Sequence, residues 1–171
     1  AHLVLLGAHK TTAIPFEMYV EGERAYVMYN GWGRYEVSAE GFYSWQTTSR
    51  IEALDLSNPA KVTVIGQHDV AGEISDSRKV GDVLYLVTFE NGYCYACDES
   101  MNTRVTSFDV SNPDAFQLID ELRLVDEEGY WGQRSIAVTT DRIYVSGMDW
   151  SGKETGVIDV IDISDPSGDL V

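Results

Sequence analysis

One short phrase recurs three times in this chain and limits the folds that the chain can adopt. Its copies are ALDLSNP at 53–59, SFDVSNP at 107–113 and VIDISDP at 160–166. A second pattern, an acidic residue before a β-rich run, places three tyrosines 59 residues apart: Tyr26, Tyr85 and Tyr144. Repetition at a fixed period of this length indicates tandem copies of one supersecondary unit. We therefore expect three units.

Within each unit the apolar residues alternate or form short β-branched runs, which is typical of strands. We expect four strands per unit, in chain order at 3–8, 16–21, 24–29, 49–56, 62–70, 74–80, 83–89, 103–110, 116–124, 134–139, 142–147 and 156–163. The units span roughly 9–67, 68–121 and 122–171, and the strand at 3–8 belongs to a preceding unit.

The recurring phrase has the chemistry of a corner at the end of the third strand. Asp, Ser and Asn side chains bond to nearby backbone amides in tight turns, and proline cannot donate a hydrogen bond to a strand ladder. The phrase recurs because the sheet recurs.

Four-stranded antiparallel sheets in tandem are typical of β-propeller blades. A sandwich is the alternative, but a sandwich does not require one strand unit to recur with the same turn residues. Propellers close with about four to eight blades, so three blades do not make a ring. We expect a piece of a longer propeller, whose further blades lie elsewhere in a parent chain. The second expectation is a homodimer that completes a six-bladed ring.

The stretch RIEALDLSNPAKVTVIGQHDVAGEISDSRKVGDVLYLV at 50–87 resembles the LVIVD-type propeller repeat. With TSFDVSNP at 106–113, it is also similar to secreted prokaryotic proteins that carry a C-terminal β-propeller domain. The resemblance covers nearly the whole chain and implies an extracellular or cell-surface location. In one departure, Lys61-Val62 stands where the LVIVD-type pattern has a second proline.

Charge and hydropathy exclude two classes of partner. Twelve basic against 28 acidic residues give a net charge of −16, which would repel a nucleic-acid backbone. No apolar run reaches the length of about eighteen residues that a membrane-spanning helix needs. We therefore expect neither nucleic-acid binding nor membrane insertion, and a protein, peptide or glycan becomes the expected partner.

The repeats differ in length mainly in the loops between second and third strands and in the connection VDEEGYWGQ at 125–133. In a four-stranded meander these loops share one end of the blade, where aromatic rings could stack on a sugar or grip a peptide. The predicted ligand-binding residues are Trp32, Tyr35, Trp45, Tyr95, Trp131 and Trp150. The alternative is that these rings fold back and cover blade edges.

Two residues separate Cys94 from Cys97 in NGYCYACDES. This spacing suits a redox dithiol, half a zinc site or a small disulfide loop. The loop contains no histidine to complete a zinc site, and the location that the resemblance implies favours a local disulfide, with free thiols as the alternative. Acidic clusters could hold calcium but lack the spacing of a calcium loop, so we expect no resident metal or cofactor.

Known catalytic signatures do not occur in the sequence. Asp76, Arg78 and Arg134 fall on inner strands, where they would face the axial channel and pair with one another. Two functions follow. The first is a non-catalytic binding or scaffolding module that uses the long-loop face. The second is part of a propeller enzyme, a hydrolase or lyase, with its site in the axial channel.

Overall fold

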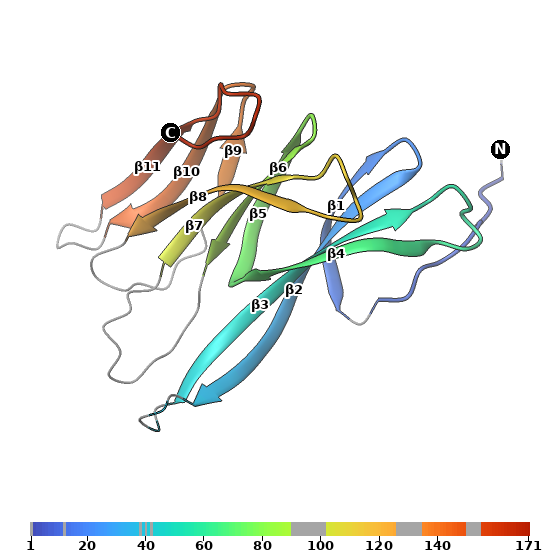
Figure 1. Ribbon diagram of the computed structural model, residues 1–171, viewed down its shortest axis with the longest axis horizontal. Helices are drawn as coiled ribbons and strands as arrows, with labels where there is room; N and C mark the ends of the chain where they lie inside the picture. The colour runs from blue at the N-terminus through green and yellow to red at the C-terminus, as the bar shows by residue number, and fades with distance from the viewer. Residues whose placement is uncertain are drawn as a thin grey trace.

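The computed structural model describes residues 2–11, 13–37, 39, 41, 43–89, 102–125, 135–149 and 155–171, which form strands and turns without a helix (Figure 1). The strands are β1 (Ile14–Glu21), β2 (Arg24–Val37), β3 (Tyr43–Asp55), β4 (Thr63–Ala71), β5 (Glu73–Val80), β6 (Val83–Phe89), β7 (Asn102–Asp109), β8 (Gln117–Val125), β9 (Ile136–Val138), β10 (Arg142–Asp149) and β11 (Thr155–Asp162). The all-β prediction is confirmed.

The strands form three antiparallel sheets in which spatial order follows chain order. β1–β4 and β5–β8 are four-stranded, and β9–β11 form a three-stranded sheet within the described residues. We call these sheets blade 1, blade 2 and blade 3. Figure 1 shows them side by side in chain order, with blade 2 between the other two. This is the tandem meander that the repeat predicts.

The core lies between blades, because alternate residues of each central strand point to opposite faces. Tyr26 and Met28 of β2 pack with Leu84 and Leu86 of β6 in one buried cluster. The opposite face of blade 2 packs on blade 3 in a second cluster, which includes Val83, Tyr85, Val87, Ile143, Val145 and Ile161. Full burial of one such side chain stabilises the fold by about 1.5–3 kcal/mol.

The repeated tyrosine occupies the same register position in each blade. The tyrosines and the residues opposite them on the third strand are Tyr26 with Ala53, Tyr85 with Ser107 and Tyr144 with Val160. The Tyr26 hydroxyl donates a 2.8 Å hydrogen bond to the carbonyl oxygen of Val110, just before the turn of blade 2. Tyr26 therefore fastens blade 1 to blade 2.

The recurring corner has the predicted turn chemistry in all three blades. The Asp55, Asp109 and Asp162 carboxylates accept hydrogen bonds from the backbone N–H groups of Ser57, Ser111 and Ser164, at 2.9, 2.8 and 2.8 Å. Bonds from the same serines hold the pKa of each carboxyl below its ordinary value. The corner is thus built from local bonds that the sequence itself specifies.

The corner regions of blades 2 and 3 also contact the outer strand of the preceding blade. A Cβ atom on Gly66 of β4 would lie 1.7 Å from the carbonyl oxygen of Pro113 in the corner of blade 2. On blade 2, Asp120 of β8 accepts a 3.0 Å hydrogen bond from the Leu170 N–H beyond the corner of blade 3. The corners therefore join the blades at their outer side.

Residues 2–11 form no strand within the described part of the chain, so the strand expected at 3–8, as part of a preceding blade, stays a prediction. A strand exists only with a hydrogen-bonded neighbour, and no described strand lies beside this segment. The segment nevertheless lies against blade 1, since a Cβ on Gly7 would be 1.7 Å from the Pro59 carbonyl oxygen. The structure describes residues 135–139 of the strand expected at 134–139. Of these, 136–138 form strand β9.

Candidate functional site

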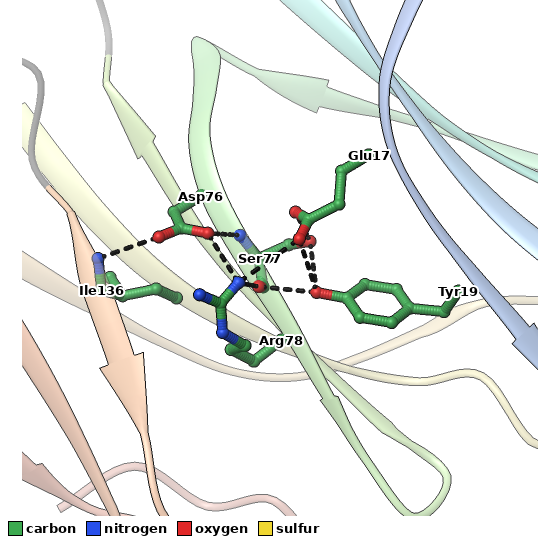
Figure 2. A network of polar contacts seen from close by, with 6 residues as sticks. All are labelled: Glu17, Tyr19, Asp76, Ser77, Arg78 and Ile136. Atoms are coloured by element: carbon green, nitrogen blue, oxygen red, sulfur yellow. Dashed lines mark hydrogen bonds and ion pairs between the residues drawn. The ribbon is translucent and has the colours of Figure 1, made fainter.

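A network of polar side chains joins the first strands of the three blades (Figure 2). We call it the inner-strand network, and its members are Glu17, Tyr19, Asp76, Ser77, Arg78 and the backbone N–H of Ile136. Glu17 and Tyr19 come from β1, the next three from β5 and Ile136 from β9. Three segments far apart in the sequence therefore meet here.

A repeated irregularity of the first strand positions the two acids. The pairing of β1 with β2 shifts register between Pro15 and Glu17, and that of β5 with β6 shifts between Ile74 and Asp76. Such a bulge inserts an extra residue and re-aims the side chains beside it. Glu17 and Asp76 thus follow the same bulge in successive blades.

Blade 1 contacts blade 2 through Tyr19, Glu17 and Ser77. The Tyr19 hydroxyl donates to the Ser77 carbonyl oxygen at 2.6 Å and lies 3.0 Å from Glu17 Oε1. Ser77 Oγ donates to Glu17 Oε2, and the Ser77 residue is fully buried. Burial raises the pKa of Tyr19, and the negative charge of Glu17 adds to the shift. The hydroxyl therefore stays protonated and acts as a donor.

Arg78 holds the two acids and the Ser77 carbonyl together. Its Nη1 donates to Asp76 Oδ1 at 2.8 Å, to the Ser77 carbonyl oxygen at 2.5 Å and to Glu17 Oε1 at 3.3 Å. Asp76 Oδ2 accepts a 3.1 Å bond from the Ile136 N–H of blade 3. Desolvation lowers the pKa of Arg78, but Tyr19 and the two carboxylates outweigh it, so the pKa is raised. One guanidinium therefore bonds to both carboxylates.

The chemistry of this network is that of a clamp between blades. The serine hydroxyl of the network, on Ser77, is buried and donates a hydrogen bond to the Glu17 carboxylate. No group of three or more His, Cys, Asp or Glu side chains in the described part of the chain could hold a metal ion. Asp76 and Arg78 were singled out from the sequence, whereas Arg134 lies outside the described residues.

Sequence reasoning missed Glu17, Tyr19 and Ser77. Glu17 stands 59 residues before Asp76, so the repeat itself marks the two acids as equivalent. Tyr19 stands 59 residues before Arg78, but nothing in the sequence shows that a tyrosine of one blade bonds to residues of the next. The repeat period is the signal that could have found Glu17.

We expect Arg78→Met to lower the free energy of unfolding by about 1–3 kcal/mol, because it leaves Glu17 and Asp76 facing one another without a cation. The Arg78 side chain is 40% exposed, so solvent screens part of the effect. Urea denaturation measures it. The control is Arg123→Met, which removes an exposed pair with Glu121 in the same blade and should change stability by about 0–1 kcal/mol. Equal effects for both variants would contradict the clamp.

The second candidate site is an aromatic pair on a projecting hairpin. Pairing of β1 with β2 ends at Asn30, and pairing of β3 with β4 begins at Thr48, so residues 32–37 and 43–47 form a two-stranded ribbon. Figure 1 shows this ribbon extending beyond the rest of blade 1. The ribbon takes the place of the loop that the sequence predicts between the second and third strands of the first unit.

Tyr35 and Trp45 face one another across this ribbon. Their ring centroids lie 4.7 Å apart at 67°, an edge-on contact, and Tyr35 is 70% exposed. The indole lies over Gly33, where a Cβ would come within 1.8 Å of a ring carbon. Trp32 lies opposite Thr48 in the same ribbon, but its side chain is outside the described part. We call Tyr35 and Trp45 the ribbon aromatics.

The other predicted contact residues, Tyr95, Trp131 and Trp150, lie outside the described residues, as do Cys94 and Cys97 of the predicted disulfide. The structure therefore brings together two of the six predicted aromatics, and it does so on one hairpin.

Comparison with known proteins bears on the fold. A family model described as Beta propeller domain matches residues 5–105, which is more than half of the chain. The chain belongs to this β-propeller family. The match begins in the segment before blade 1 and ends inside β7, so it includes the first corner and the whole inner-strand network of blades 1 and 2. No curated protein and no solved structure matches the chain.

In the described residues there is no helix with the length and apolar character needed to cross a bilayer.

Proposed function

We propose that this β-propeller is a non-catalytic binding or scaffolding module that contacts a protein, peptide or glycan through its long-loop face. The observation that carries the proposal is the pair of ribbon aromatics. Tyr35 is largely exposed and is held edge-on against Trp45 on a hairpin outside the blade core. Rigid aromatic rings with a polar edge offer a large contact area at a small loss of conformational entropy.

The exposure of the ribbon supports a contact role over a packing role. In the described part of the chain no residue of the ribbon belongs to a buried core cluster, and a two-stranded ribbon is marginal in stability by itself. Tyr43, at the first position of β3, is also 66% exposed. Rings that covered a blade edge would be buried against it, whereas Tyr35 and Tyr43 are exposed.

The inner-strand network supports a non-catalytic role for the described inner strands. Arg78 Nη1 and both carboxylate oxygens of Asp76 bond to groups of this chain, including Glu17 of blade 1 and the Ile136 N–H of blade 3, as expected of a contact between blades. The finer assignments are part of the same proposal: an LVIVD-type repeat, and an extracellular or cell-surface location that the resemblance to secreted prokaryotic proteins supports. The charge of −16 makes nucleic acid an unsuitable partner.

The test is a screen of the fluorescently labelled protein on a glycan microarray and a peptide array, followed by titration of the strongest ligand found. Tyr35→Ala and Trp45→Ala should each weaken binding about tenfold or more, since aromatic anchors dominate such contacts. The ribbon lies outside the core clusters, so thermal melts should stay close to that of the wild type. The control is Leu118→Ala, an exposed apolar residue on β8. Full binding by both aromatic variants would refute the ribbon as the contact site.

A further inference from the structure

A cavity of about 180 Å³ lies between blades 1 and 2. Residues of the outer strand β4 form one wall, and residues of β6, β7 and β8 form the other. Within the described part of the chain, its lining shares no residue with the inner-strand network or the ribbon aromatics. Thr88, Thr106 and Phe108 of the lining are buried, whereas Asp69 and Leu118 are exposed. The cavity therefore reaches from solvent to core side chains.

Thr88 brings a buried hydroxyl to this cavity. The residue is 1% exposed, and its Oγ1 has no hydrogen-bond partner within the described residues. A buried hydroxyl has lost its bonds to bulk water, so most such groups are paired. Thr88 lies opposite Arg104 in the β6–β7 ladder, and Thr106 follows Arg104 by two positions on the same face of β7. A molecule in the cavity could supply the bond that Thr88 lacks.

His68 brings a second polar group. Its ring meets the Phe108 ring edge-on, with centroids 5.0 Å apart at 61°, and this contact orients the imidazole. Burial lowers the pKa of His68, although the negative charge of Asp69 opposes the shift. The ring is therefore neutral near pH 7, with one N–H donor and one nitrogen acceptor.

The repeat shows that the fold does not require a histidine at this position. His68 lies opposite Ile51, four residues before the corner aspartate of blade 1. At the equivalent position of blade 2, Leu122 lies opposite Val105, four residues before its own corner aspartate. Leu122 packs against the apolar core between blades 2 and 3. The polar side chain thus belongs to the cavity and not to the repeating scaffold.

The acids of the lining are already paired with arginines. Asp69 accepts bonds from Arg50 at 2.6 and 3.1 Å. Glu121 accepts bonds from Arg104 at 3.0 and 3.2 Å. Neither acid therefore offers an uncompensated charge to a cation, and the net charge of −16 opposes the approach of an anion. The lining suits an uncharged ligand.

The rest of the lining adds apolar surface, from Val70, Phe108 and Leu118. The volume is below the roughly 300–1,000 Å³ of pockets that hold drug-sized ligands, so it suits a single ring. A sugar ring carries hydroxyls that both donate and accept, together with an apolar face of C–H groups. We propose that this cavity binds one uncharged sugar unit, whose hydroxyls bond to Thr88 and His68 and whose C–H face packs on the apolar lining.

This site goes beyond the proposed ribbon contact, because none of its residues lies on the ribbon. Either site can therefore fail without the other. Tyr35→Ala, which should impair the ribbon contact, should leave binding of a sugar in the cavity unchanged.

The test is saturation-transfer NMR of the whole chain with glucose, galactose, mannose and N-acetylglucosamine as probes. Acetate and methylammonium serve as small charged probes. We expect at least one of the sugars to bind and neither charged probe to compete with it. The proposal is overturned if none of the four sugars binds, or if a charged probe displaces the bound sugar.

Substitutions locate the bound sugar. Thr88→Val keeps the shape of the side chain without its hydroxyl, and His68→Leu installs the residue that blade 2 uses. Each should weaken sugar binding about tenfold or more, because a bond to the ligand is lost. Thermal melts check that both variants fold.

The matched control is Thr103→Val. Thr103 is also 1% exposed and its hydroxyl has no partner within the described residues, but it does not line the cavity. This variant should bind the sugar as the wild type does. Undiminished binding by the Thr88 and His68 variants, or an equal loss in the Thr103 variant, would place the sugar elsewhere and overturn the proposal.

Discussion

Leu86→Ala is expected to lower the free energy of unfolding by about 2–5 kcal/mol, the range for truncating a fully buried leucine. Leu86 is 0% exposed and lies on β6 in the cluster between blades 1 and 2. Its removal leaves a cavity between two sheets whose backbones are fixed by their own strand ladders, so the site cannot easily collapse. Equilibrium denaturation in urea measures the loss.

The matched control for Leu86 is Leu118→Ala in the same blade. Leu118 is 56% exposed on β8, so the same change should cost less than about 1 kcal/mol. If the two variants lost the same stability, the interface between blades 1 and 2 would not be the core of this protein.

Gly66→Ala is expected to destabilise the protein by about 1–3 kcal/mol or more, through overpacking rather than through lost contacts. The added methyl carbon would lie 1.7 Å from a backbone carbonyl oxygen in the corner of blade 2, and backbone cannot move aside as a flexible side chain can. Strand β4 or the corner must shift, which weakens the contact between the blades. The melting temperature and urea midpoint should both fall.

A second glycine provides the control. Gly156→Ala introduces the same methyl group into β11, where the nearest heavy atom would be the Gly147 carbonyl oxygen at 3.9 Å. This variant should keep the stability of the wild type or gain slightly, since alanine restricts the unfolded chain more than glycine does. Comparable losses in both variants would show that the effect at Gly66 is not a steric one.

Local chemistry explains why the corners could be predicted. Asp55 and Asp109 each bond to an amide two residues ahead, and a bond of that kind depends on little beyond the phrase itself. The strand periodicity was informative for the same reason, because alternation is a property of consecutive residues.

The strand expected at residues 3–8 depends instead on a neighbouring strand, which the described residues do not include. The sequence at 5–9 matches that of β4 at 64–68, and the place against a corner is also the same. What differs is the neighbour: β4 lies beside β3, and no described strand of this chain lies beside residues 2–10. A strand depends on its partner, and the pattern of a single segment does not contain that information.

The candidate sites divide in the same way. That Tyr35 and Trp45 fall in one long loop is visible in the sequence, but their edge-on contact depends on the β2–β3 register, which continues far beyond the ends of the expected strands. The bonds from Tyr19 and Glu17 to Ser77 and Arg78 join residues about sixty positions apart. The repeat period relates positions that are equivalent, whereas these residues are neighbours.

The sequence by itself determined the repeating unit, its strands and its corners, because each depends on interactions between residues close along the chain. Only the tertiary structure decided which faces are covered and which side chains bond across blades. Those features arise where one blade packs on another, and identical positions become buried or exposed according to whether a neighbouring blade is present.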